Sequence, residues 1–389
     1  MSNTLTGQIN NIYEALDVVS RELTGMIPAV AKNVSAESAA IDQTVRIPVA
    51  PAASLVQIAP ANVSPDSGGQ VIGYKDMTIS KSYAVPVAWT GEEQKSLEGR
   101  ANNIMKDQFS QAFRAITNQV EADLCSLYIH GSRAYGTAGA TPFSSSLEDA
   151  ARMKKILDDN GAPDDGMRSI VANTSAGVNL RSLAHLTANY SAGTTDTLRQ
   201  GVLLPLFGLD VRESAGIKSH TKGAGTGYVV VAAGAAADQT TVSMDGGDSG
   251  TIEAGDIVTF GTGGGSGTGT DYDTKYVVAS DGAAAAAKII TLGAPGLLVA
   301  RVDNDACTVG SSYVANMAFH KNAIQLITRA PEMPQGGDSA EDVMLVTDPI
   351  SGLTFQIVMY KQYRQVHFEV GLAWGYAAIK PEHISVLIG

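Results

Sequence analysis

The clearest element in this sequence is a run of apolar residues at helical spacing from Thr90 to about His130. Thr90 and Glu93 form a capping-box signature at its start, and Gly131 stands at its end. The pattern predicts one amphipathic helix, which at 1.5 Å per residue would span roughly 60 Å. Most globular domains need no helix of that length, so we expect it to be a spine; a helix broken near Gly99 and a coiled-coil helix are the alternatives. The apolar positions are Leu97, Ala101, Ile104, Met105, Phe109, Phe113, Ile116, Val120, Leu124 and Leu127.

The residues before this helix have the character of an extended arm. Residues 41–89 contain two stretches with prolines, TVRIPVAPAASLVQIAP and GYKDMTISKSYAVPVAW, separated by the loop NVSPDSGG. Their apolar residues outnumber those that a lone two-stranded ribbon can bury, so we expect the arm to lie on a neighbouring subunit. Residues 1–30 contain a modest amphipathic helix that ends before Pro28, and the tether AVAKNVSAESAA follows it. The helix is expected to dock either on a neighbouring subunit or on the body of its own chain. Its apolar residues are Ile9, Ile12, Leu16, Val19 and Leu23.

The residues after the spine show two different secondary-structure patterns. Residues 146–217 alternate helix, strand, helix and strand, with Ser146 and Asp149 at the start of the first helix and Gly161 at its end. This alternation predicts an α/β core. Residues 218–312 contain only short strands between turns rich in Gly, Thr and Asp, which predicts a small β-barrel or sandwich.

After Ser312 the pattern changes again. YVANMAFHKNAIQLITRAP is predicted to be helical, and strands are predicted in VMLVTD, in GLTFQIVMYKQYRQVHFEVGLAWGYAAI and in ISVLIG. The β region therefore interrupts an α/β body, and three serial domains are the alternative. The inward faces of the two long strands are predicted to carry Phe355, Ile357 and Met359 on one and Val366, Phe368, Val370 and Leu372 on the other.

Composition excludes several classes of function. The net charge is −12, and no basic cluster interleaved with aromatic residues offsets it, so tight nucleic-acid binding is not expected. Cys125 and Cys307 lie far apart and outside any zinc-binding spacing, which favours a reducing cytoplasm. The sequence shows neither a secretory signal nor about 18 uninterrupted apolar residues, so we expect no membrane span.

One stretch resembles a catalytic motif. Residues 247–250 read Gly-Asp-Ser-Gly, as around the nucleophile of chymotrypsin-like serine proteases, with Ser249 as the candidate. A serine needs a histidine base and a carboxylate, and His220 is the nearest upstream histidine. It lies in a polar Lys/Gly/Thr stretch, and Thr251 replaces the usual fifth glycine. A Gly-Asp turn between short strands is the stronger interpretation.

Other candidate sites are weaker still. GTGGGSGTGT contains no phosphate-binding pattern between a strand and a helix, and it is interpreted as a flexible loop. The acidic pairs at residues 158–159 and 164–165 are interpreted as solvated turn carboxylates. The six histidines show no metal-binding spacing. We therefore predict no enzyme, with no catalytic, cofactor-binding or metal-binding residues.

Several segments, taken in order, resemble the major capsid proteins of tailed bacteriophages with the HK97 fold, and specifically the phage P22-like coat proteins that carry an insertion domain. SIVANTSAGVNLRSL resembles the strand-then-helix segment of that family, and FGLDVRESAGIKSHTKG the strand that leads into the insertion. AGDIVTFG, YVVAS and ITLGAP resemble the insertion barrel. MAFHKNAIQLITRAPEMP resembles the return into the axial domain, and LAWGYAAIKPEHISVLIG the C-terminal strand region.

The resemblance implies an α+β, HK97-like capsid fold with an inserted small β-barrel. The implied divisions are an N-terminal arm (1–40), an extended loop or E-loop (41–89), the spine helix with the first part of the peripheral domain (90–145), the first part of the axial domain (146–217), the inserted β-barrel domain (218–312), the second part of the axial domain (313–340) and the peripheral strands with the C-terminus (341–389).

The same resemblance implies a structural role in a virion. The chain would be made in the host cytoplasm, would self-assemble into hexamers and pentamers of an icosahedral shell with a scaffolding protein and a portal, and would enclose double-stranded DNA without sequence-specific binding. Some HK97-like capsids join Lys to Asn covalently; Lys75 and Lys81 lie in the arm, but no partner Asn or catalytic Glu can be assigned, so no crosslink is predicted.

Two alternatives from other classes stay open. An encapsulin-like bacterial compartment shares the fold, although an inserted β domain argues against it. A chymotrypsin-like serine hydrolase that uses Ser249 is the second.

Overall fold

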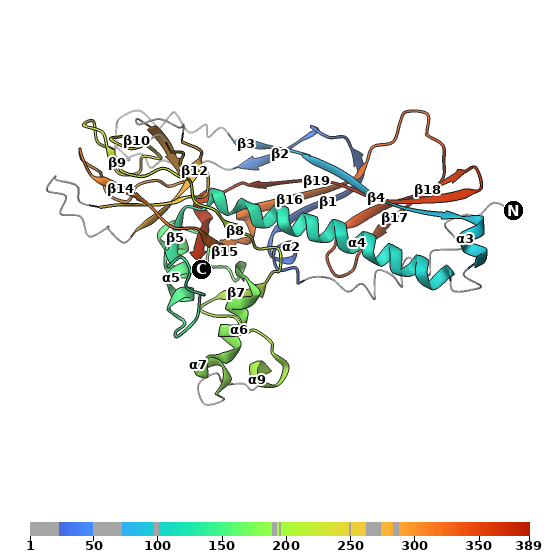
Figure 1. The fold of residues 1–389 in the computed structure, drawn as a ribbon, viewed down its shortest axis with the longest axis horizontal. Helices are drawn as coiled ribbons and strands as arrows, with labels where there is room; N and C mark the ends of the chain where they lie inside the picture. The colour runs from blue at the N-terminus through green and yellow to red at the C-terminus, as the bar shows by residue number, and fades with distance from the viewer. Residues whose placement is uncertain are drawn as a thin grey trace, which may run out of the picture.

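The computed structural model describes residues 23–49, 72–96, 101–188, 193, 196–248, 250–261, 274–282 and 288–389. Within these ranges the chain forms two large β-sheets, a long helix and a separate two-stranded hairpin, as Figure 1 shows. This architecture confirms the predicted α+β class. In the same ranges, no helix has both the length and the apolar character needed to cross a membrane.

The first sheet has six strands and packs against the spine. Its order is β1, β16, β19, β18 and β17, and β4 also pairs with β19. The inward residues that the sequence predicted on β18 and β19 are buried, except for Val366, which is partly buried. The strands are β1 (Ala31–Ala39), β4 (Lys81–Thr90), β16 (Ile324–Pro331), β17 (Ala340–Thr347), β18 (Thr354–Gln362) and β19 (Gln365–Ala378).

The spine is helix α4 (Ala101–Cys125), which lies across this sheet in Figure 1. Phe109 and Phe113 are fully buried, and their rings contact Phe368 at 5.5 Å and Phe355 at 5.1 Å between centroids. The 25 residues of α4 span about 37 Å. The described spine is therefore shorter than the single helix that the sequence predicted.

A separate short helix lies at each end of the predicted spine. The capping box is confirmed at α3 (Gly91–Ser96): the N–H of Glu93 donates to Oγ1 of Thr90 at 3.3 Å, and the N–H of Thr90 donates to Oε2 of Glu93 at 2.8 Å. Residues 97–100 lie outside the described ranges. At the other end, the chain tightens into the 3₁₀ helix η2 (Ser126–His130) before Gly131.

The predicted arm divides into two parts. β2 (Thr44–Val49) and β3 (Gly73–Thr78) form a separate antiparallel hairpin, whereas the rest of the second stretch is β4 in the six-stranded sheet. The segment predicted to be a tether, residues 29–40, is largely strand β1, and the short helix α2 (Met26–Ala29) before it includes Pro28, before which the sequence predicted that the N-terminal helix had ended. The N-terminal amphipathic helix was predicted largely from residues before position 23, which lie outside the described ranges.

The second sheet has twelve strands, and part of it, together with helices, forms the α/β body. Helix α5 (Glu148–Asp159), strand β6 (Arg168–Ala172), helix α6 (Thr174–Ser182) and strand β7 (Leu209–Glu213) follow one another, which confirms the predicted alternation. Two short helices, α7 (Ala184–Thr187) and α9 (Asp196–Gln200), lie between α6 and β7. The remaining body strands are β5 (Arg133–Gly136), β8 (Ser219–His220), β15 (Tyr313–His320) and β20 (Ile384–Ile388).

The helix predicted after Ser312 is wrong. That segment forms β15 and β16, joined by the short 3₁₀ helix η3 (Lys321–Ala323). Both strands are buried on both faces, so their apolar residues run on without the period of two that identifies a half-exposed strand. A continuous apolar run with Ala, Met and Leu cannot be told from a buried helix by spacing alone.

The predicted β region is a closed six-stranded barrel. The strand order is β11, β14, β9, β10, β13 and β12, and β11 also pairs with β12. β12 extends onto β5 of the body, and β15 pairs with β6. Because the chain before and after the barrel belongs to one body, the barrel is an insertion. Its strands are β9 (Tyr228–Val230), β10 (Thr241–Asp245), β11 (Ile257–Phe260), β12 (Lys275–Ser280), β13 (Lys288–Leu292) and β14 (Ala306–Val309).

Candidate functional site

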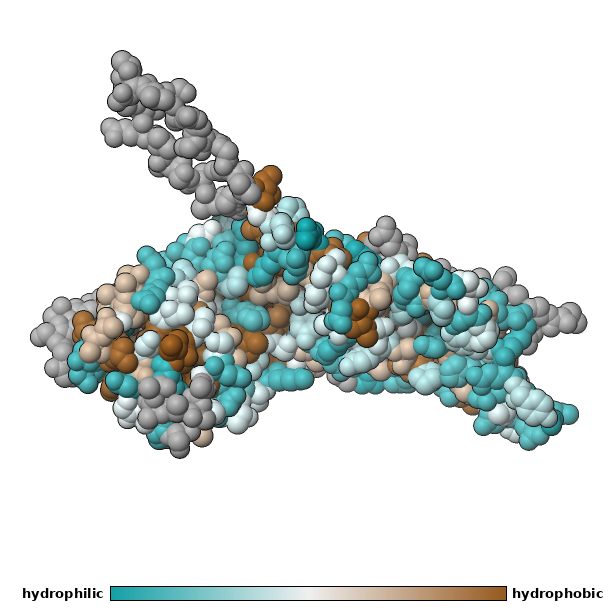
Figure 2. Space-filling model, turned by 90° about the horizontal axis from the view of Figure 1, so that it is seen from above, coloured by the Kyte–Doolittle hydropathy of each residue, from teal (hydrophilic) through white to brown (hydrophobic). Residues whose placement is uncertain are grey.

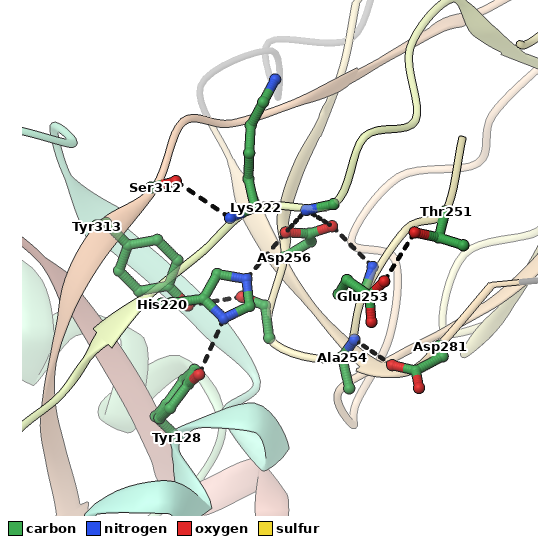
Figure 3. Close-up of polar contacts among 12 residues, drawn as sticks. Tyr128, His220, Lys222, Thr251, Glu253, Ala254, Asp256, Asp281, Ser312 and Tyr313 are labelled. Atoms are coloured by element: carbon green, nitrogen blue, oxygen red, sulfur yellow. Dashed lines mark hydrogen bonds and ion pairs between the residues drawn. The ribbon is translucent and has the colours of Figure 1, made fainter.

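Four segments that are distant in the sequence meet where the barrel joins the body. Tyr128 comes from η2, His220 from β8, Asp256 from the turn before β11 and Tyr313 from the start of β15. Figure 3 shows their side chains gathered at one place. The ring of His220 lies 5.2 Å from that of Tyr313 and 5.7 Å from that of Tyr128, between centroids. We call these four residues the joint.

Asp256 is the polar centre of the joint. It is 1% exposed and accepts hydrogen bonds from Nε2 of His220 at 2.9 Å and from the N–H groups of Gly223 at 3.1 Å and Glu253 at 2.8 Å. A carboxylate can only accept, so Nε2 carries a proton, and in the neutral ring Nδ1 accepts from the hydroxyl of Tyr128 at 2.9 Å. Burial and the charge of Asp256 raise the pKa of Tyr128, which keeps that hydroxyl protonated. Both nitrogens of His220 are therefore engaged.

The turn that carries Asp256 packs tightly against the rings. Tyr313 donates its hydroxyl to the carbonyl of Gly255 at 2.6 Å. Gly255 has a φ of +95°, and a Cβ built there would lie 2.8 Å from Cε2 of Tyr128 and 3.0 Å from Cε1 of His220. This position therefore needs glycine both for its backbone conformation and for the close approach of the rings.

We expect Gly255→Ala to destabilise the chain by about 2–4 kcal/mol, because it adds steric overlap to a strained backbone. Gly139→Ala is the matched control: Gly139 has a φ of +81°, but nothing lies within 4 Å of the point that a Cβ would occupy there, so only the strain of about 1 kcal/mol applies. Denaturant midpoints of the two variants would measure the difference. Equal losses of stability in the two variants would mean that the joint is loosely packed around Gly255.

A second polar cluster fixes the base of the N-terminal segment on the spine. Glu121 of α4 is 2% exposed, and its Oε1 accepts from the N–H of Gly25 at 2.6 Å, the N–H of Met26 at 2.7 Å and Oγ of Ser214 at 2.6 Å. Its Oε2 accepts from the N–H of Ile27 at 3.0 Å. Four donors therefore satisfy one buried carboxylate, as burial of a charge requires. We call Glu121 and Ser214 the clamp.

The described structure places one of the two residues named in the hydrolase hypothesis. Ser249 lies outside the described residues. His220, which the sequence placed in a polar stretch, is buried, with Asp256 at one ring nitrogen and Tyr128 at the other. A general base needs a ring nitrogen directed at its nucleophile, and in this arrangement neither nitrogen is available.

The two arm lysines contact groups of their own chain. Nζ of Lys75 donates to the carbonyl of Ala378 at 2.7 Å, and Nζ of Lys81 donates to Oδ1 of Asp123 at 2.7 Å. Burial lowers the pKa of Lys81, but the hydrogen bond and charge of Asp123 outweigh it, and the net shift is upward. Asp123 also accepts from Nε1 of Trp374, so this carboxylate links β4, α4 and β19. These contacts of the two lysines therefore stabilise the attachment of the arm to the rest of its own chain.

The acidic pairs near Gly161 lie at two places: residues 158–159 end helix α5, and residues 164–165 stand in the turn that follows. Each carboxylate has a basic or imidazole partner, at distances from 2.5 to 3.1 Å: Asp158 with Arg168, Asp159 with Lys155, Asp164 with Lys154 and Asp165 with His320. Within the described ranges, no group of three or more His, Cys, Asp and Glu residues could hold a metal ion. Burial raises the pKa of the Cys125 and Cys307 thiols to about 12, so both stay protonated near neutral pH.

The described surface exposes apolar groups and an open sheet edge. Tyr363, in the turn between β18 and β19, is 92% exposed, and Val343 and Leu345 on β17 are each 41% exposed. Among the described strands, β17 pairs only with β18. Figure 2 shows further hydrophobic groups scattered among hydrophilic ones, including some at the end that holds the barrel. An unpaired edge beside exposed apolar residues is typical of a surface that another chain covers.

Neither the joint nor the clamp was anticipated from the sequence. His220 is 92 residues from Tyr128 and 36 from Asp256, and Glu121 is 93 residues from Ser214. No spacing rule connects residues so far apart. The available signal was a pair of charged residues, Glu121 and Asp123, between the apolar positions Val120 and Leu124 of the spine.

Comparison with solved structures finds similar backbones in two phages and in a virus-like particle. The chain is similar to a chain from Mycobacterium phage Che8, with 14% identity, a TM-score of 0.47 and coverage of 94% of this chain and 91% of that one. It is similar to the capsid of cyanophage P-SCSP1u, with 10% identity, a TM-score of 0.48 and coverage of 95% and 88%. It is also similar to a virus-like particle from Pyrococcus furiosus, with 10% identity, a TM-score of 0.44 and coverage of 98% and 99%.

Sequence comparison adds no relative. No family model matches the chain, and no curated protein matches it significantly. At these identities and TM-scores, the structural likeness concerns only the path of the backbone.

Proposed function

We propose that this chain is a major capsid protein of a tailed bacteriophage, which self-assembles into an icosahedral shell enclosing double-stranded DNA. The observation that carries the proposal is the order of its elements. A separate hairpin, a long helix across a six-stranded sheet, an α/β body and a barrel inserted into that body follow one another along the chain. This is the order that the quoted sequence segments imply for an HK97-like coat protein of the P22-like type.

The exposed surface supports assembly. The hairpin of β2 and β3 pairs with no other described strand, and Ile72 and Tyr74 at its outer end are 68% and 60% exposed. The inner face of the hairpin packs on its own chain, where Met77 is buried with Ile327 and Ile379, and contact with another copy would cover the exposed outer end. The open edge of β17 offers a second place where a neighbour can pair.

The charge of the chain supports a container for DNA. At −12 the subunit repels nucleic acid over long range, so packaged DNA would not adhere to the shell wall. We propose hexamers and pentamers as the capsomers, with a scaffolding protein and a portal as partners during assembly. The predicted divisions of the chain, from the N-terminal arm at 1–40 to the peripheral strands at 341–389, are proposed as its functional parts.

The direct test is negative-stain electron microscopy, with sedimentation, of the chain expressed with and without a scaffolding partner. We expect closed shells or capsomer-like rings, because the open edge and the hairpin need partners. A compact monomer under every condition would contradict the proposal. Nucleic acid in particles from the native source would separate a phage shell from an encapsulin-like compartment.

The hydrolase alternative has a test of its own. We expect Ser249→Ala to leave shell formation unchanged, because a shell requires no nucleophile at that position. The measurement is the yield of assembled particles, alongside hydrolysis of a generic ester by the unaltered chain. Hydrolysis that disappears in the variant would favour the hydrolase.

A further inference from the structure

The clamp and the joint are carried by the end of the spine, which here means the last turn of α4 together with the 3₁₀ helix η2 that follows it. Glu121 lies on α4, and Tyr128 follows seven residues later on η2. Glu121 holds the base of the N-terminal segment, residues 25–27, and Tyr128 holds the entry to the barrel through His220. The end of the spine therefore contacts two parts of the molecule that the sequence separates by almost 200 positions.

A short linker, residues 214–220, connects the two clusters a second time. Ser214 belongs to the clamp, and the N–H of Ala215 donates to the carbonyl of Leu23 at 2.9 Å. Further along, the N–H of Ala315 donates to the carbonyl of Lys218 at 3.3 Å. The linker ends in β8, which pairs with β15 and places His220 in the joint.

The linker also has little room to move. A Cβ at Gly216 would lie 3.1 Å from Cγ of Glu121, and a Cβ at Gly25 would lie 2.5 Å from the carbonyl oxygen of Glu213. Two residues beyond the linker, the N–H of Lys222 donates to Oγ of Ser312 at 3.1 Å, which ties the entry of the barrel to its exit. The linker is therefore held along its length between the N-terminal segment and the barrel.

We propose that the end of the spine, from Glu121 to Tyr128, couples the base of the N-terminal segment to the inserted barrel, so that releasing either one loosens the other. If residues 25–27 leave, Glu121 keeps only one of its four donors, and a buried carboxylate with so few donors is costly. It then turns toward water and releases Ser214, which frees the linker that positions His220. In the reverse direction, loss of the contacts that His220 makes in the joint frees the same linker from its C-terminal end.

This coupling is a property of the single chain and does not depend on the proposed function. Its consequence for a shell does rest on that function: a neighbour that displaces the N-terminal segment would change how firmly the barrel is held. Coupling between sites is reciprocal, so the barrel would affect the N-terminal segment equally.

Amide hydrogen exchange in the full, unassembled chain tests the proposal. Asp256→Asn keeps the shape of the side chain but replaces one acceptor oxygen by a donor, which leaves either Nε2 of His220 or the N–H of Glu253 without an acceptor. We expect exchange at residues 25–27 to accelerate by about tenfold or more, although these residues do not contact Asp256. In the reverse direction, Glu121→Gln is expected to accelerate exchange at Gly223.

A matched control separates coupling from general weakening. Val242→Ala opens a cavity in the barrel core, since Val242 on β10 is fully buried in a cluster that contains none of the four joint residues. We expect it to accelerate exchange within the barrel and to leave residues 25–27 unchanged. The proposal is overturned if Val242→Ala accelerates their exchange as much as Asp256→Asn does, or if Asp256→Asn affects only the barrel.

Two further variants complete the test. If Asp256→Asn fails to fold, Tyr128→Phe removes only the hydroxyl that His220 accepts from and is measured in the same way. In the Glu121→Gln, Asp256→Asn double variant, coupled clusters give a loss of denaturant stability smaller than the sum of the two single losses. Independent clusters would instead give losses that add, as distant sites ordinarily do, and that result would refute the coupling.

Discussion

Phe109→Asp is expected to prevent the chain from folding. Phe109 is fully buried between α4 and the six-stranded sheet, and its ring contacts Phe368 edge to face. Truncating a buried phenylalanine costs about 3–5 kcal/mol, and an unpaired buried carboxylate adds several more. The sum is comparable with the whole stability of an ordinary domain. We expect insoluble protein, or a chain with no cooperative thermal transition by circular dichroism.

Gln111→Asp is the control for this substitution. Gln111 lies two positions further along the same helix and is exposed, so the change introduces the same carboxylate without burying it. Its melting midpoint is expected to stay close to that of the unaltered chain. If Phe109→Asp also kept that midpoint, α4 would not be packed on the sheet as a spine.

Local patterns predicted much of the fold because their partners are close in sequence. The capping box of Thr90 and Glu93 involves residues three apart, and it forms as predicted. The alternation of Phe355, Ile357 and Met359 reports a strand with one face in the core, and these residues are buried there. The short strands of the barrel were equally visible, because turn residues bound each of them.

Prediction failed where burial removed the local signal or where the partners were remote. β15 and β16 are buried on both faces, so their apolar residues do not alternate and were interpreted as a helix. β4 belongs to the sheet rather than to the hairpin because it pairs with β19, about 280 residues later. The partners of Glu121 and His220 lie on other segments, and only tertiary structure brings them together.

Removal of the barrel is expected to leave a folded body that assembles poorly or into shells of altered size. The structure indicates where to cut: His220 pairs with Tyr313 across β8 and β15, so deleting residues 222–311 leaves two ends on adjacent strands that a two-residue Gly turn can join. The body keeps its six-stranded sheet and the clamp. It loses Asp256 from the joint and β12 from the edge of β5.

These losses set the size of the expected effect. Without Asp256, His220 loses a buried charged partner, which costs about 2–4 kcal/mol and lowers the melting midpoint by roughly 5–15 °C. The midpoint follows from circular dichroism, and assembly from electron microscopy and sedimentation with a scaffolding partner. Shells of unaltered size and yield would show that the barrel is not needed for assembly. A body that folds but fails to form shells would show that the barrel contributes contacts between subunits.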